Sequence, residues 1–131
     1  MAIGRCGDNY KSLTSATNRS HRIDFVQWNV MNACLRDSSV DVVITDLPFG
    51  KRSGSKADNR TLYPATLLSL ARLTPPKTGR AVLLTQDRNS MFKSIPKVAK
   101  YWKTVKHIQC NIGGLTALVF VLSRTDSAFS S

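Results

Sequence analysis

The sequence predicts an α/β fold built around a mostly parallel sheet that ends in an antiparallel hairpin. Residues 40–45 and 81–85 are rich in β-branched and aliphatic side chains and nearly continuous in apolar character, as strands covered on both faces are. A stretch with helical periodicity lies between them, and two glycines near the end indicate a hairpin. We therefore expect one small domain over residues 1–124 and a flexible tail over 125–131.

The first half of the chain contains two predicted strands and a helix. Apolar patterns predict strands over 23–28 and 40–45, and the second strand ends where proline and glycine follow it. Leucines at three-residue spacing predict a helix over 62–73. Thr61 is the candidate cap of this helix, and Pro64 fits its first turn.

The second half contains a strand, a short helix and the hairpin. The strand covers 81–85, and Asp87 is placed to cap a helix that runs to Lys93 and is ended by Pro96. The last two strands are predicted over residues 101–111 and 115–123.

The charge balance indicates a polyanionic partner. The chain of 131 residues has 19 Lys and Arg against 8 acidic residues, a net charge of +11. Such a surface attracts nucleic acid through phosphate neutralisation, although basic charge also serves solubility alone. The three cysteines are widely spaced and lack the spacing of a zinc site, so no metal is expected. The first residues have no signal-peptide pattern and no apolar run is membrane-length, which predicts a cytoplasmic protein that also fits the nucleus.

A short acidic motif follows the strand over 40–45. Asp46, Leu47, Pro48 and Phe49 lie at its carboxyl end, where open parallel sheets bind ligands. A carboxylate and a backbone carbonyl beside proline can accept both N–H bonds of a nucleobase amine and orient its nitrogen toward an electrophile. An aromatic ring next in sequence can stack on the base, which contributes about 1–3 kcal/mol. The four residues alone fit an ordinary strand-to-loop turn equally well.

A basic loop after the motif favours the functional interpretation. Lys51, Arg52, Lys56 and Arg60 suit the phosphates that flank a bound base. The loop is not a P-loop, because the Gly-Lys-Ser/Thr pattern is absent. A second basic run over 88–106 is more typical of a solvated lysine face.

Residues 45–52, 79–87 and 112–115 resemble the catalytic domain of THUMP-domain-containing RNA methyltransferases. The similarity covers roughly residues 24–124 and is greatest to the branch that makes N2-methylguanosine in tRNA. Asp-Leu-Pro-Phe is similar to the Asn/Asp-Pro-Pro-Tyr/Phe motif of amino-group methyltransferases. The resemblance implies a Rossmann-like class I methyltransferase fold that uses S-adenosylmethionine.

The resemblance also implies a role for each residue of the motif. Asp46 would accept a hydrogen bond from the guanine amine, beside the cofactor, with help from a main-chain carbonyl near Leu47 and Pro48. Phe49 would stack on a base turned out of its helix, as enzymes that modify bases require. The amine would then receive the methyl group of S-adenosylmethionine.

Two further residues match cofactor-binding positions of the family. Asp8 matches the end of a strand whose acid binds the cofactor ribose, and a terminal turn is the alternative interpretation. Trp28 and Asn29 match a Trp-Asp pair whose acid contacts the adenine amino group; Asn29 keeps the acceptor oxygen and loses the charge. The family's glycine-rich turn and THUMP domain have no counterpart before Asp8, so the resemblance implies a partial methyltransferase domain.

The sequence leaves three functions open. The first is S-adenosylmethionine-dependent tRNA (guanine-N2)-methylation, with RNA and a small zinc-binding activator subunit as the implied partners. The second is a catalytically inactive RNA-binding remnant of such an enzyme, and the third is a small basic structural protein. The intact motif at Asp46 favours the first function, and the absent glycine-rich turn favours the second.

Overall fold

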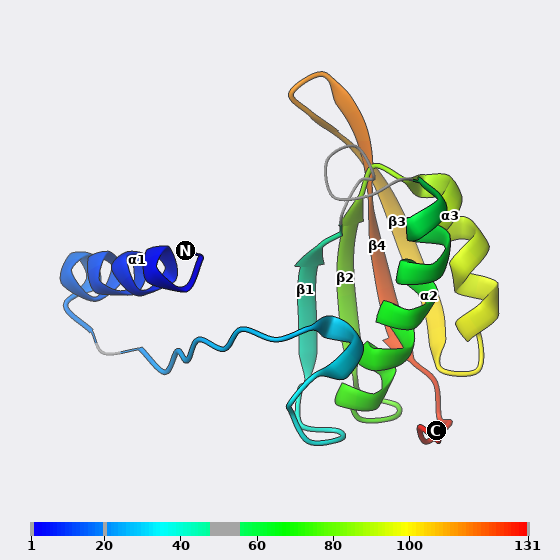
Figure 1. The fold of residues 1–131 in the computed structure, drawn as a ribbon, viewed down its shortest axis with the longest axis horizontal. Helices are drawn as coiled ribbons and strands as arrows, with labels where there is room; N and C mark the ends of the chain where they lie inside the picture. Colours follow the sequence, from blue (N-terminus) through cyan, green and yellow to red (C-terminus); the bar gives the residue numbers. More distant parts are fainter. Residues whose placement is uncertain (1, 20, 48–55, 131) are drawn as a thin grey trace.

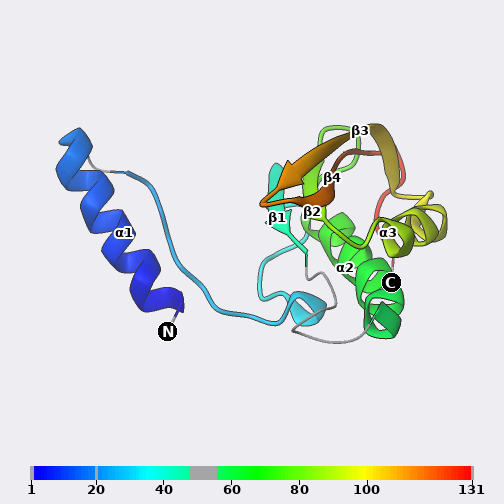
Figure 2. The same cartoon turned by 90° about the horizontal axis from the view of Figure 1, so that it is seen from above.

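The computed structural model describes residues 2–19, 21–47 and 56–130, and for residues 2–4 and 56–58 it describes the backbone alone. The main body is a twisted sheet with helices against one face (Figure 1). Helix α1 (Ala2–Thr17) lies apart from this body at the end of an extended segment, as a perpendicular view also shows (Figure 2). The sheet and the helices packed on it therefore hold the residues from which a site can be built.

The described sheet has four strands in the order β1-β2-β4-β3. Strands β1 and β2 run parallel, with Asp46 opposite Leu84, whereas β4 runs antiparallel to both β2 and β3. The α/β class and the final hairpin are confirmed, and the described sheet is mixed, with one parallel pair. The strand bounds are β1 (Val42–Asp46), β2 (Arg80–Thr85), β3 (Trp102–Ile112) and β4 (Leu115–Arg124).

The turn between β3 and β4 contains the two glycines that indicated it. Gly113 has a φ of 55° and Gly114 a φ of 83°. A two-residue hairpin with positive φ at both positions matches the right-handed twist of its strands, and glycine adopts such angles without steric cost. The predicted hairpin is therefore confirmed together with its physical reason.

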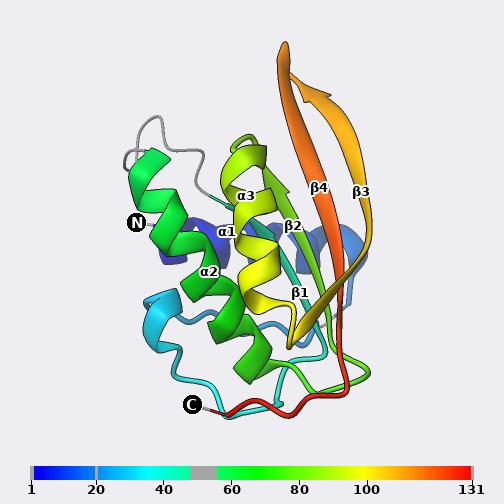
Figure 3. The same cartoon turned by 90° about the vertical axis from the view of Figure 1, so that its right-hand side faces the viewer.

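Helices α2 (Lys56–Leu73) and α3 (Arg88–Ser94) cover one face of the sheet (Figure 3). Asp87 caps α3 as predicted, because its side chain accepts a hydrogen bond from the Ser90 backbone N–H. No helix in the described part of the chain is long and apolar enough to cross a membrane. The helical bounds are α2 (Lys56–Leu73), α3 (Arg88–Ser94) and the short 3-10 helices η1 (Val30–Asn32) and η2 (Ile95–Val98).

The core lies between the sheet and these helices. Strand β2 buries alternate residues toward them, and the Trp102 indole N–H donates to the Leu67 carbonyl at 2.8 Å, which ties β3 to α2. Burying a large apolar side chain contributes about 1.5–3 kcal/mol, so this layer supplies most of the stability. Its most buried large side chains are Trp102, Tyr63, Phe120, Leu67, Leu83, Met91, Leu122 and Val98.

Helix α2 begins earlier than its leucine spacing predicts. It starts at Lys56, so Thr61 lies inside the helix instead of capping it, and Pro64 lies in the interior instead of the first turn. The early part of the helix is polar, and Asn59 in it is nevertheless 2% exposed. A tertiary contact, which helical periodicity does not report, holds this part of α2 in place.

Two N-terminal predictions of strands are wrong. Residues 23–28 form no strand, and Phe25 and Trp28 in this segment are 39% and 40% exposed. Asp8 lies in helix α1 and not at a strand end. A strand needs a neighbouring strand to bond its backbone, whereas a helix bonds internally, and neither segment pairs with a strand among the described residues.

Strand β1 is covered on one face only, which corrects the prediction of cover on both. Val42 is 51% exposed and Ile44 is 79% exposed, on an edge strand whose described neighbour is β2 alone. Continuous apolar character in a strand is typical of burial on both faces. In the described structure Val43 and Thr45, on the other face, are half-buried.

Residues 125–130, expected to form a flexible tail, contact the main body. The Thr125 N–H donates to the Tyr101 carbonyl at 2.8 Å, and the Phe129 ring lies 5.3 Å from the Tyr101 ring. Just before this segment, Arg124 is 3% exposed. Its guanidinium donates to backbone carbonyls of Tyr101, Ala71, Thr74 and Ser127.

Candidate functional site

Asp46 lies at the carboxyl end of β1, where the sequence placed it. Its neighbour Leu47 is 5% exposed and donates its backbone N–H to the Leu84 carbonyl at 2.8 Å, so the strand pairing extends past Asp46. The Asp46 side chain is exposed at this carboxyl edge. A well-fixed backbone with a carboxylate in solvent suits a group that must meet an incoming ligand.

Several predicted site residues lie beyond what the structure describes. Pro48 and Phe49 of the motif, and Lys51 and Arg52 of the basic loop, are outside the described residues. Lys56 begins α2, and only its backbone is described.

A cavity of about 470 Å³ adjoins Asp46. The extended segment before η1, strand β1 and helix α2 all contribute to its wall, which is mainly apolar. Trp28 forms part of this wall and is 40% exposed. An apolar cavity beside an exposed carboxylate fits a flat heteroaromatic ring that carries an amine. The lining residues are Trp28, Val30, Val43, Ile44, Thr45, Asp46, Leu47, Leu62, Thr66 and Leu70.

A buried polar cluster, which we call the Asn59–Asp87 clamp, joins α2 to the start of α3. The Asn59 side-chain amide donates to Asp87 Oδ2 at 3.0 Å. Ser90 donates to the same carboxylate through its hydroxyl at 2.7 Å and its backbone N–H at 3.2 Å. Asp87 is 7% exposed, and a buried carboxylate requires such donors.

Tyr63 and Thr85 extend this cluster into the core. Their hydroxyl oxygens lie 2.7 Å apart, and Thr85 Oγ1 also accepts the Asp87 backbone N–H at 2.9 Å. Burial raises the pKa of Tyr63, and the negative charges of Asp87 and Asp46 raise it further, against the Thr85 hydrogen bond that lowers it. The sequence predicted Asp87 of this cluster as a helix cap. For Asn59 and Tyr63 the only sequence signal was their spacing of one helical turn.

The two remaining cofactor candidates are not among the lining residues, although Asn29 stands between Trp28 and Val30, which are. Asp8 is an exposed residue of α1, which Figures 1 and 2 place apart from the sheet. Asn29 caps η1 by accepting the Met31 backbone N–H at 2.9 Å on its side-chain oxygen. Of the residues matched to cofactor positions, the described structure brings Trp28 and Asp46 together at the cavity and does not bring Asp8 to it.

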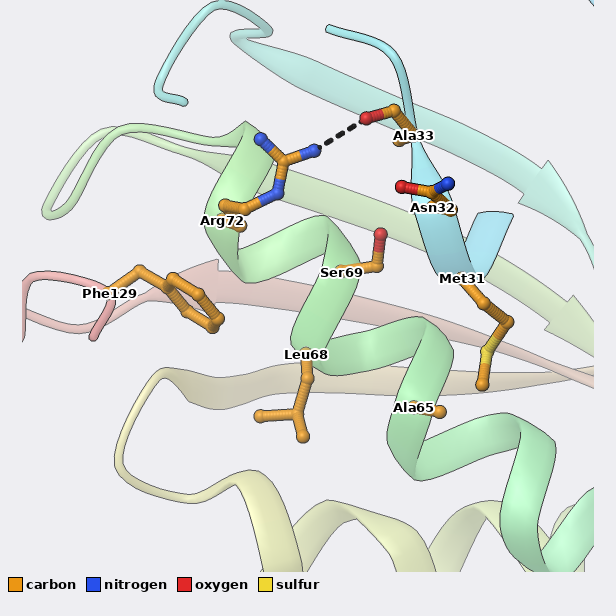
Figure 4. A pocket seen from close by; sticks show the side chains of 8 residues that line it. All are labelled: Met31, Asn32, Ala33, Ala65, Leu68, Ser69, Arg72 and Phe129. Atoms are coloured by element: carbon orange, nitrogen blue, oxygen red, sulfur yellow. Dashed lines mark hydrogen bonds between the residues drawn. The ribbon is translucent and has the colours of Figure 1, made fainter. Parts of the chain in front are cut away.

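A second cavity of about 520 Å³ lies on the outer side of α2 (Figure 4). Its polar groups already serve the fold, because Ser69 donates to the Val30 carbonyl and Arg72 donates to the Ala33 carbonyl at 2.9 Å. No cluster of three or more metal-ligating side chains occurs in the described ranges. The cavity beside Asp46 is therefore the better candidate for chemistry. The second cavity is lined by Met31, Asn32, Ala33, Ala65, Leu68, Ser69, Arg72 and Phe129.

The fold around this site is that of a methyltransferase-like α/β domain. TrmN from Thermus thermophilus superposes with a TM-score of 0.68 and 23% identity over 87% of this chain and 32% of that chain. The N-methyltransferase NodS from Bradyrhizobium japonicum superposes with a TM-score of 0.58 and 11% identity over 86% of this chain and 65% of that chain. These likenesses establish the fold, which was predicted.

The sequence comparison establishes the family. Residues 8–117 match the RMKL-like methyltransferase domain, and the chain belongs to this family. The tRNA (guanine(6)-N(2))-methyltransferases THUMP3 of mouse and human are each 44% identical to it over 136 aligned residues. The match covers 98% of this chain and 27% of each relative, so the chain spans about a quarter of their length. The predicted resemblance to THUMP-containing RNA methyltransferases is thereby confirmed.

Proposed function

We propose that this chain takes part in S-adenosylmethionine-dependent methylation of the guanine exocyclic amine in tRNA. The observation that carries the proposal is the exposed carboxylate of Asp46 at the carboxyl end of β1, beside an apolar cavity. Open α/β sheets bind ligands at this edge. The identity to tRNA (guanine(6)-N(2))-methyltransferases supports guanine and tRNA as the substrate class.

Asp46 acts on the acceptor base in this proposal. Its carboxylate accepts one N–H of the amine, and the carbonyl of Leu47 or Pro48 accepts the other, which directs the nitrogen lone pair toward the methyl donor. Orientation of this kind contributes several kcal/mol without strong acid–base chemistry. S-adenosylmethionine, when bound, supplies an electrophilic methyl group. Phe49 stacks on the base in the same proposal.

The cavity residues support a role for this chain in binding the adenine of the cofactor. Trp28 offers a ring face for the adenine, and the apolar wall excludes water from it. Asp8, proposed for the ribose, would have to move toward the cavity to take part, and Asn29, proposed for the adenine amine, would have to release the Met31 N–H that its side chain accepts. Lys51, Arg52, Lys56 and Arg60 are proposed to contact RNA phosphates, and a small zinc-binding activator subunit is the proposed protein partner.

The experiment compares two matched variants, Asp46→Asn and Asp41→Asn. Both remove one exposed carboxylate, but Asp41 precedes β1 at its opposite end. We expect binding of S-adenosylmethionine by calorimetry and formation of N2-methylguanosine in tRNA by nucleoside mass spectrometry. Asp46→Asn should lower methyl transfer at least tenfold and Asp41→Asn should leave it unchanged. Equal activity in the two variants would remove Asp46 from the site.

The second candidate function is an RNA-binding remnant without catalysis. It is favoured by the position of Asp8 in α1, away from the cavity. The same samples test it, because a remnant would bind tRNA and leave S-adenosylmethionine unbound at every concentration tried.

A further inference from the structure

Two exposed arginines lie beside the Asn59–Asp87 clamp. Arg60 follows Asn59 in α2, and Arg88 follows Asp87 at the start of α3. The 3.0 Å hydrogen bond between Asn59 and Asp87 brings the two backbones together while both arginine side chains are exposed. Two exposed arginines from different helices therefore directly follow the two residues that this hydrogen bond joins.

The anchor is rigid. Asp87 is held by two donors from Ser90 and by the bond from its own N–H to Thr85 Oγ1. Asn59 is 2% exposed and Asp87 is 7% exposed, so water has little access to the hydrogen bond between them. A fixed backbone lowers the conformational entropy that the arginines lose when they contact a ligand.

Neither arginine belongs to an ion pair among the described residues. The single ion pair among the described residues joins Arg72 to Asp37, so it involves neither Arg60 nor Arg88. The chain as a whole carries +11. Guanidinium groups bind phosphate oxygens through two parallel hydrogen bonds, which makes arginine well suited to a nucleic-acid backbone.

The pair lies at the edge of the sheet that carries Asp46. Strands β1 and β2 run parallel and end at Asp46 and Thr85, and α2 and α3 both begin at that end (Figure 3). A base that reaches Asp46 would carry its flanking phosphates over this edge. RNA is therefore the polyanion that the position favours.

We propose that Arg60 and Arg88 form a phosphate clamp that grips the RNA backbone next to the target base, with their spacing set by the Asn59–Asp87 hydrogen bond. This inference rests on the proposed function in one respect, that RNA is the substrate. The proposal assigns an RNA contact to α3. Its basic residues belong to the run over 88–106, which the sequence alone indicated as a solvent-exposed face without a partner.

The test compares two double variants that each remove two positive charges. Arg60→Gln with Arg88→Gln removes both arginines of the proposed phosphate clamp and keeps the Asn59–Asp87 hydrogen bond. Lys97→Gln with Lys103→Gln removes two exposed lysines at the other end of the sheet, in η2 and at the start of β3. The readout is fluorescence anisotropy of a labelled tRNA transcript at several salt concentrations, without cofactor. Circular dichroism confirms that all three proteins are folded.

If Arg60 and Arg88 form the phosphate clamp, the RNA affinity should fall at least tenfold in the double arginine variant and less than threefold in the double lysine variant. The slope of log K against log salt should become shallower by about 0.7–0.9 for each lost phosphate contact. Equal losses in the two double variants would overturn the proposal in favour of diffuse charge, and so would absence of tRNA binding by the unaltered chain. Because RNA binding is measured without catalysis, failure of methyl transfer alone would overturn the proposed function. It would not contradict the proposal that Arg60 and Arg88 bind RNA phosphates.

Discussion

The hydroxyl oxygens of Tyr63 and Thr85 lie 2.7 Å apart in the core, and Thr85 directly follows Leu84, which pairs with Asp46. Both residues are fully buried, and Thr85 Oγ1 also accepts the backbone N–H of Asp87. Helix α2, strand β2 and the start of α3 are joined through these atoms. The rigidity of the candidate site therefore rests on hydrogen bonds that do not touch a ligand.

Tyr63→Phe should lower the free energy of unfolding by about 0.5–1.5 kcal/mol, the usual value of one buried hydrogen bond. The ring stays in place, so the loss reports the contacts of the hydroxyl group, including its hydrogen bond with Thr85. Urea denaturation monitored by circular dichroism measures it. Tyr10→Phe is the matched control, because the Tyr10 hydroxyl bonds to His21 within the N-terminal segment and should matter little. A loss no larger than that of the control would contradict the prediction.

The raised pKa of Tyr63 predicts a loss of stability at alkaline pH. The folded protein holds the Tyr63 proton more tightly than the unfolded chain, whose tyrosine has a pKa of 10.0. The stabilising contribution is thus fully present below pH 10.0 and is lost as the pH rises through the folded pKa. Unfolding free energies measured across this range should fall for the unaltered chain, and Tyr63→Phe should remove this part of the decline. Identical pH profiles would rule out the linkage to Tyr63.

Gly79→Ala should destabilise the fold by about 1–3 kcal/mol through overpacking. A Cβ at Gly79 would lie 2.7 Å from Thr74 Cβ and 2.8 Å from both Arg124 Cγ and the Pro75 carbonyl oxygen. Gly7→Ala is the opposite case, because nothing lies within 4 Å of its added Cβ inside α1. That change should stabilise the helix by about 0.5–1 kcal/mol. Thermal unfolding of the two variants compares them directly, and the same sign of effect at both sites would be incompatible with this packing.

Asn59→Ala should weaken RNA binding although it leaves the net charge unchanged. The substitution removes the amide that holds Asp87, and this should cost about 1–3 kcal/mol of stability and loosen the spacing of Arg60 and Arg88. Anisotropy with labelled tRNA, at a temperature where circular dichroism shows the variant folded, measures the effect. Asn89→Ala, on an exposed position of α3, is the control. Undiminished RNA affinity in a folded Asn59→Ala protein would show that the spacing of Arg60 and Arg88 does not affect RNA binding.

Local signals in the sequence were sufficient for much of the fold. Strand β2, the Asp87 cap and the two-glycine hairpin were predicted, because each depends on side chains within a few residues of one another. Asp46 was also placed correctly at a carboxyl strand end, where a β-branched run meets proline. The prediction of a strand over 23–28 was wrong, since an apolar pattern of this kind forms a strand only when another strand pairs with it.

By itself the sequence determined the fold class, the position of Asp46 and the excess of positive charge. Only the tertiary structure decided that Asn59 meets Asp87 across 28 positions of the chain, which is the contact on which the proposed pairing of Arg60 and Arg88 rests. Helical periodicity places a residue on a face of its own helix and contains no information on which distant polar group that face will meet. Such a contact is set by how the helices pack on the sheet, because a buried carboxylate is tolerated only where packing brings donors to it.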